Sequence, residues 1–330
     1  PPHRAGRCSM LDFVYYPVSA ILWFWHKAFG AVLGPPDNGV AWALAVIFLV
    51  FTVRLVLLTP AIRQIRTTRR MQKLQPQIAA LQRKYAGDRS RMALEMQQLQ
   101  KEHGFNPLMG CLPALVQIPV FLGLFHVLRS FNRTGTGLGR PGMTPDENAN
   151  TANYLFGAAD VQSFLGARLF GAPISAAITT PENTLVSFVH FGGIPALGTI
   201  AAVAVPLMVI AGLATHFNAR AALPQGNPDP PAANPQSAVM NKIMLWVFPL
   251  GALVGGPFLM IAILLYWVSN NIWTYVQQRI VHARLDREDA AEHLRREEMR
   301  QAAAPRNRAR TGREEVPEEG PSLSPHPPAS

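Results

Sequence analysis

Charged residues and cysteines are both scarce in this sequence. Only 15% of the 330 residues are charged, against roughly 25% in an average soluble domain, while 49% are hydrophobic. The two cysteines, Cys8 and Cys111, suggest no disulfide framework and no cysteine-based metal site. These shortages argue against a soluble enzyme, and the composition is typical of an integral membrane protein.

Long apolar runs alternate with basic segments along the chain. Five runs have about the length that a helix needs to cross a hydrocarbon core of roughly 30 Å. They lie near residues 40–62, 107–129, 195–217, 240–255 and 257–277. Gly255-Gly256-Pro257 separates the last two, which predicts a tight hairpin. The fourth run is shorter than the hydrocarbon core, so we expect local thinning of the bilayer around it. The predicted fold class is an all-α integral membrane protein with five transmembrane helices.

The basic residues predict the orientation in the membrane. Segment 63–104 carries ten Lys or Arg and three acidic residues, whereas segment 132–194 carries three Arg and four acidic residues. The positive-inside rule therefore places 63–104 in the cytoplasm and the 132–194 loop outside. Five spans then put the amino terminus outside and the tail, 278–330, in the cytoplasm.

The segments flanking this core, 35–277, are predicted separately. Residues 1–9 are expected to be disordered or a non-native remnant. In residues 10–34, apolar side chains recur at helical spacing, but the continuous apolar run is too short to cross a membrane. This pattern favours an amphipathic helix at the outer interface. A signal peptide is the alternative, because Arg4 and Arg7 precede the run. The tail should first continue the last helix and then be mostly disordered, since it is rich in Pro, Arg and Glu.

The cytoplasmic segment 63–104 has two amphipathic runs on either side of Gly87-Asp88. Apolar residues in each run recur every three or four positions, which predicts a helical hairpin. Its many basic side chains have two open interpretations. They serve only the positive-inside rule, or they contact anionic lipid headgroups, ribosomal RNA or an incoming chain.

One charge lies inside an apolar run, at Arg54. A charged side chain near the bilayer centre costs about 2.5 kcal/mol or more, so it indicates function by default. No Asp or Glu occurs in the five runs, and the polar groups available at depth are Gln117, Thr215, Ser269, Asn270 and Asn271. Snorkelling of Arg54 to the cytoplasm is one alternative, but helical side chains tilt toward the helix amino terminus, which here faces outside. We favour a hydrated, positively charged cavity that opens to the cytoplasm.

Four stretches of the sequence resemble the YidC family of membrane protein insertases. They read "DFVYYPVSAILWFW", "VFTVRLVLLTPAIRQIRTTRRMQKLQPQIAALQRKY", "EHGFNPLMGCLPALVQIPVFLGLFHVLRSFN" and "LLYWVSNNIWTYVQQRIV". The resemblance implies a five-helix core around a hydrophilic groove open to cytoplasm and lipid, in a bacterial cell membrane. It also implies that Arg54 receives the polar segment of a client, with Gln117 and Trp267 at further groove positions.

The resulting functional prediction is a non-enzymatic insertase and chaperone for membrane proteins. The client-binding groove would comprise Arg54, Gln117, Thr215, Trp267, Ser269, Asn270 and Asn271. We assign no catalytic residue, metal or cofactor. Nascent membrane proteins, the ribosome, the Sec translocon and anionic lipids are the expected partners, with no DNA and no small-molecule substrate. The alternative is an ion channel or transporter with an anion site at Arg54, although the sequence shows no internal repeat.

Overall fold

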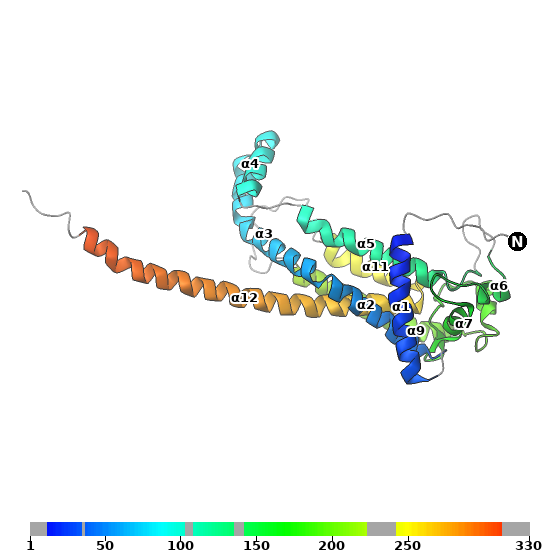
Figure 1. Cartoon of the computed structure of the whole chain (residues 1–330). Helices are drawn as coiled ribbons and strands as arrows, with labels where there is room; N and C mark the ends of the chain where they lie inside the picture. The colour runs from blue at the N-terminus through cyan, green and yellow to red at the C-terminus, as the bar shows by residue number, and fades with distance from the viewer. Residues whose placement is uncertain (1–11, 35–36, 103–107, 135–141, 223–241, 312–330) are drawn as a thin grey trace, which may run out of the picture. The chain divides into compact units, whose positions relative to one another are not determined.

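The computed structural model describes residues 12–34, 37–102, 108–134, 142–222 and 242–311, and these are predominantly helical (Figure 1). The first half of the chain forms α1 (Asp12–Leu33), α2 (Gly39–Val56), α3 (Leu58–Lys84), α4 (Arg89–Glu102) and α5 (Leu108–Arg129). Short elements follow: α6 (Pro145–Ala149), α7 (Ala158–Gly166), β1 (Arg168–Leu169), β2 (Ala172–Pro173), α8 (Glu182–Leu185) and η1 (Val186–Phe188). The last elements are α9 (Leu197–Ala222), the π-helix η2 (Ile243–Val247), α11 (Phe248–Gly255), η3 (Gly256–Phe258) and α12 (Ile261–Thr311). The helical content confirms the predicted all-α class.

Among the residues that the structure describes, two helices are long and apolar enough to cross a membrane, namely α2 and α9. The 18 residues of α2 span about 27 Å, close to the thickness of a hydrocarbon core. Two shorter apolar helical segments are Ile118–Arg129 and Ile243–Phe258. The number of five membrane spans therefore stays a prediction.

The first apolar run is interrupted earlier than the sequence suggested. The prediction was a span to residue 62, but α2 ends at Val56 and α3 begins at Leu58. Pro60 has no amide hydrogen to donate to the carbonyl of Val56, four residues before it. The intervening Leu57 has φ −86° and ψ 5°, away from helical values. The end of α2 is thus set by a proline rather than by the end of the apolar run.

The chain divides into two compact units, Pro1–Arg279 and Ile280–Ser330, and α12 contributes residues to both. The last helix continues past residue 278 as predicted, but it extends to Thr311, where a mostly disordered tail was expected. The reason is local: this stretch is rich in Ala, Glu and Arg, which are strong helix formers. A Glu292–Arg296 ion pair of 2.5 Å, one turn apart, adds to it. Residues 312–330 and 1–11 lie outside the described residues.

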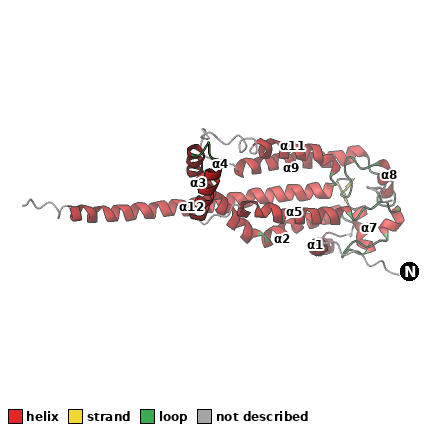
Figure 2. Cartoon of the chain, turned by 90° about the horizontal axis from the view of Figure 1, so that it is seen from above, coloured by secondary structure: helices red, strands yellow, loops and turns green. Residues whose placement is uncertain are grey.

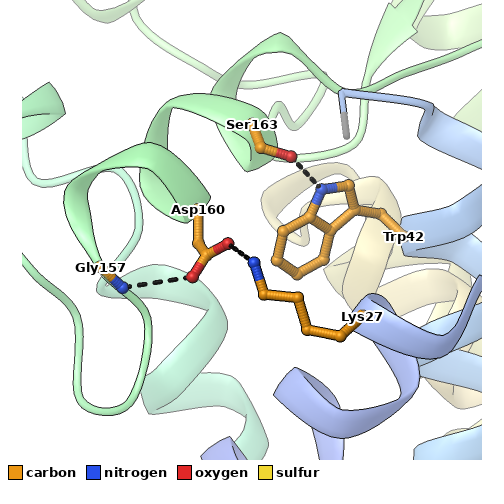
Figure 3. A network of polar contacts seen from close by, with 5 residues as sticks. All are labelled: Lys27, Trp42, Gly157, Asp160 and Ser163. Atoms are coloured by element: carbon orange, nitrogen blue, oxygen red, sulfur yellow. Dashed lines mark hydrogen bonds and ion pairs between the residues drawn. The ribbon is translucent and has the colours of Figure 1, made fainter. Parts of the chain in front are cut away.

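In the first unit, the predicted outer loop is a folded layer rather than a plain connection. Trp42 of α2 is fully buried among the rings of Phe131, Phe156 and Phe164. Its indole Nε1 donates a 3.0 Å hydrogen bond to Ser163 Oγ of α7 (Figure 3). This aromatic cluster ties α2 to segment 142–194.

The same layer is attached to α1. Lys27 Nζ lies 2.5 Å from Asp160 Oδ1, and the second oxygen of Asp160 accepts from the amide of Gly157 at 3.3 Å (Figure 3). Helix α1 also packs closely on α2 and α5. The predicted amphipathic helix 10–34 therefore exists as α1, with its inner face on the protein and Phe13, Tyr16 and Phe24 exposed.

Backbone hydrogen bonds attach segment 174–179 to the turn between α11 and α12. The amides of Ile261 and Ala262 donate to the carbonyls of Ala176 and Ile174, at 3.1 and 2.9 Å. The amide of Thr179 donates to the carbonyl of Pro257 at 3.1 Å. Helices α11 and α12 are joined by the short η3, as the Gly255-Gly256-Pro257 triplet predicted, and α11 lies beside α9 (Figure 2). The start of α12 is thereby fixed in position.

Candidate functional site

Arg54, in the last turn of α2, reaches across to α12. Its Nε and Nη2 atoms donate to Oδ1 of Asn270, at 2.9 and 2.6 Å, and Nη2 also donates to Thr274 Oγ1 at 3.2 Å. Asn270 and Thr274 are one helical turn apart, so they share one face of α12. The three side chains form a cluster that we call the arginine cluster.

Aromatic packing sets the spacing between these two helices. The rings of Phe51 and Trp273 lie 5.3 Å apart, beside the arginine cluster. Long side chains of α2 and α12 therefore make the contacts between the two helices at this point: a guanidinium meets an amide and a hydroxyl, and two aromatic rings pack beside them.

A second polar group lies between α9 and α12, and we call it the asparagine cluster. Asn218 Nδ2 donates to Oδ1 and to the backbone oxygen of Asn271, at 2.9 and 3.1 Å. Thr215 Oγ1 donates to the same Oδ1 at 3.4 Å, and Asn271 Nδ2 donates to the carbonyl of Trp267 at 2.9 Å. Asn218 and Asn271 are both buried. This cluster fixes the rotation of α12 relative to α9, and hence the direction in which Asn270 points.

The predicted site residues thus fall into different places. Arg54 with Asn270, and Thr215 with Asn271, are brought together in two clusters. The hydroxyl of Ser269 donates to the carbonyl of Leu265 on its own helix, at 2.7 Å. Trp267 joins the asparagine cluster through its backbone carbonyl. The side chain of Gln117 lies outside the described residues.

Sequence reasoning missed Thr274 and Asn218, which both make direct hydrogen bonds within the clusters. A simple signal was available for each. Thr274 follows Asn270 by four positions, and Asn218 follows Thr215 by three. Extending the polar positions along one helix face would have found both residues.

Neutral hydrogen-bond acceptors hold the Arg54 side chain in place without neutralising its positive charge. Its acceptors are an amide oxygen and a hydroxyl oxygen, and none of its hydrogen bonds in the described part of the chain goes to a carboxylate. A guanidinium has five N–H donors. Its Nη1 atom has no acceptor among the described residues, which leaves two donors for another group. The arginine cluster can therefore bind an acceptor, above all an anionic one.

Helices α3 and α4 carry the basic segment predicted as a hairpin. They are separated by residues 85–88, where Asp88 Oδ1 accepts from the amide of Arg91 at 3.0 Å. Exposed cationic side chains lie on both helices: Arg63, Arg66, Arg70, Lys73, Arg83, Lys84, Arg91 and Lys101. The segment therefore presents a positively charged surface, as its composition predicted.

Fold and site together define a helical integral membrane protein with an arginine held between two helices. The family described as 60Kd inner membrane protein matches residues 35–288, and the chain belongs to this family. It is 58% identical over 295 residues to a Mycolicibacterium paratuberculosis protein named membrane protein insertase YidC, covering 89% of this chain and 82% of that protein.

Other relatives carry the same name. A Mycobacterium leprae protein named membrane protein insertase YidC is 58% identical over 295 residues, covering 89% of this chain and 76% of that protein. One from Corynebacterium efficiens is 34% identical over 293 residues, covering 84% and 69% of the two chains. The predicted membership of the YidC family is confirmed.

Proposed function

We propose that the protein is a membrane protein insertase of the cell membrane, which accepts hydrophilic segments of client membrane proteins at the arginine cluster. The names of the relatives support the activity. The observation that carries the site is the charge of Arg54, which neutral acceptors hold between α2 and α12. A client carboxylate is the complementary partner that the described part of the chain does not supply.

The mechanism requires no covalent chemistry. Moving a polar segment with an acidic residue through hydrocarbon is opposed by the loss of its hydration. A polar gap that contains Arg54 replaces part of this hydration and offers a transient ion pair. The client's own apolar segment then enters the lipid, and its burial drives the reaction forward.

The remaining features extend this proposal. Five spans, with the amino terminus outside and the basic α3–α4 segment in the cytoplasm, would open the groove toward that segment. Gln117 and Trp267 would line it with the two clusters. The exposed cations of α3 and α4 would meet the ribosome or anionic headgroups, and the Sec translocon is a further candidate partner.

Reconstitution tests the activity directly. The purified protein in liposomes should protect the translocated tail of a single-span client from external protease, whereas empty liposomes should not. A chloride-flux assay on the same vesicles distinguishes the alternative, because a channel with Arg54 as its anion site would pass chloride without inserting the client. Flux without insertion would reject the insertase proposal.

Cysteine labelling tests the groove. Single cysteines at Arg54 and Asn270, in a background without Cys8 and Cys111, should react with a membrane-impermeant reagent from the cytoplasmic side. Labelling from the outside only would contradict a groove that opens to the cytoplasm.

A further inference from the structure

The turn between β1 and β2 contains an aromatic residue in an unfavourable backbone conformation. Phe170 and Gly171 form its two central positions, with φ of 50° and 85°. Two-residue hairpin turns with positive φ at both positions favour Asn-Gly, since Asn tolerates this conformation and a bulky side chain does not. Phenylalanine is thus at the position where asparagine would be expected.

A second aromatic residue with positive φ provides a comparison. Tyr154 has φ 52°, and its ring packs edge-on against Tyr15 and Tyr16, with centroids 5.7 and 5.5 Å apart. Internal contacts therefore offset the strain at Tyr154. Phe170 is 86% exposed and has no ring contact in the described part of the chain. The strain at Phe170 has no such internal compensation.

The turn is nevertheless held firmly. The guanidinium of Arg168 donates from Nη1 to the carbonyl of Gly171 at 3.1 Å, and from Nη2 to the carbonyl of Phe191 at 3.1 Å. Nη2 also donates to the carbonyl of Gly193. One arginine thus fixes the turn and the adjacent segment, so Phe170 is displayed at a defined place.

That place is at the amino-terminal ends of α2 and α9. Asn38, which caps α2, forms a bridge with Arg168, and a Cβ on Gly39 would lie 1.9 Å from the Arg168 carbonyl oxygen. A Cβ on Gly171 would lie 3.4 Å from Thr199 Cγ2, in the first turn of α9. The turn therefore contacts the amino-terminal ends of α2 and α9, both long and apolar enough to cross a membrane. The end of a helix that crosses a membrane lies at the depth of the lipid headgroups.

We propose that Phe170 is an aromatic anchor that inserts into the headgroup region of the leaflet at the amino-terminal ends of α2 and α9. The bilayer is the occupant because the turn is continuous with two membrane-crossing helices. The apolar surface extends toward α9 through Ile194 and Leu197, which are 57% and 50% exposed. Aromatic side chains are enriched at this depth. Contact between the Phe170 ring and lipid would offset the conformational free energy that the strained turn costs. The anchor is separate from the arginine cluster and does not depend on its role.

Fluorescence in proteoliposomes tests the depth. The full chain, with Cys8 and Cys111 replaced by serine, carries an environment-sensitive nitrobenzoxadiazole dye on a cysteine at position 170. The matched control carries it at Asp146, an exposed residue of α6. The dye at 170 should emit at shorter wavelength and be quenched by lipids with a nitroxide near the headgroup. Emission and quenching equal to those at 146 would overturn the proposal, and so would a blue shift without lipid quenching, which indicates a protein partner.

Two substitutions separate the anchor from a purely structural turn. Phe170→Asn suits the left-handed conformation, so thermal stability in detergent should be kept or raised. When the dye is attached to a cysteine at position 194, the Phe170→Asn variant should lose the quenching of the dye by nitroxide lipids. The Phe170→Trp variant should retain this quenching. Unchanged quenching in Phe170→Asn would show that the aromatic ring does not hold the turn in the lipid, and would reject the anchor.

Discussion

Oδ1 of Asn270 accepts two hydrogen bonds from Arg54, from Nε at 2.9 Å and from Nη2 at 2.6 Å. This side-on fork orients the guanidinium without cancelling its charge, because the amide is neutral. The sequence offered several neutral polar groups near Arg54, and the structure shows that Asn270 is the one that orients it. A client carboxylate must either use Nη1 or compete with Asn270.

Arg54→Ala should fold and should fail on clients with acidic tails. Removing a charge from within the membrane relieves a cost. It also removes the charge-assisted hydrogen bonds to a client carboxylate, worth about 1.5–3 kcal/mol, so insertion of an acidic client should fall by roughly tenfold to a hundredfold. Arg54→Lys should be intermediate, because lysine keeps the charge but cannot form the fork.

The measurement is protease protection of two clients that differ only by Asp→Asn in the translocated tail. All variants are compared at equal protein levels. If alanine impaired both clients equally, Arg54 would act through hydration or structure rather than as an ion partner.

Asn270→Asp should act as an internal competitor. The carboxylate would replace the amide against Arg54 with almost no change in size, and would neutralise the charge that a client needs. Insertion of the acidic client should drop toward the Arg54→Ala level, while its Asp→Asn counterpart keeps most of its efficiency. Asn270→Ala is the control: it frees the guanidinium, so acidic clients should suffer less than in Asn270→Asp. The reverse order would contradict competition at Arg54.

Asn218→Leu should destabilise the contact between α9 and α12. It removes both donations to Asn271 from a buried position, and hydrogen bonds between helices in membranes contribute about 0.5–2 kcal/mol. Thr215→Val should cost less, since its bond to Asn271 is longer, at 3.4 Å. Thermal unfolding in detergent measures both. Equal stability of Asn218→Leu and the parent would show that the asparagine cluster does not hold α12.

His26 should make the α1–α2 contact sensitive to acid. Its ring is 2% exposed and stacks on Trp42, with centroids 3.7 Å apart. Burial lowers the pKa of His26 from 6.5 to about 4, although nearby Asp160 opposes the shift. The unfolded chain therefore binds a proton between these pH values while the folded chain does not. Stability is retained above pH 6.5 and falls as the pH decreases toward 4, by about 3 kcal/mol at most.

The control is His26→Phe, which keeps an aromatic ring on Trp42 and cannot be protonated. Thermal unfolding at pH 7 and at pH 4.5 should differ less in this variant than in the parent. An equal pH dependence in both proteins would assign the acid sensitivity to other groups.

Local pattern was enough to predict most of the helices. The apolar runs around Arg54 and after Leu197 predicted α2 and α9, because a helix in lipid must be apolar over most of its length. The glycine-proline triplet at 255–257 predicted the turn before α12. The break at Leu57 was in the sequence too, as Pro60, but the continuous apolarity obscured it. The continuation of the last helix was predicted, but its extent to Thr311 was underestimated because charged composition was given more weight than helix propensity.

The sequence also determined that Arg54 lies among apolar residues and that Asn270, Asn271 and Thr215 are polar residues within reach. Which of them meet depends on helix rotation, and rotation follows from packing between segments more than 200 positions apart, such as Phe51 with Trp273. Adjacent residues of α12 point about 100° apart, so Asn270 meets Arg54 while Asn271 meets Asn218. Composition and periodicity determined which polar residues lie within the apolar helices. Tertiary packing decided which of them contact one another, because periodicity assigns residues to a face of a helix but not to the neighbour that this face meets.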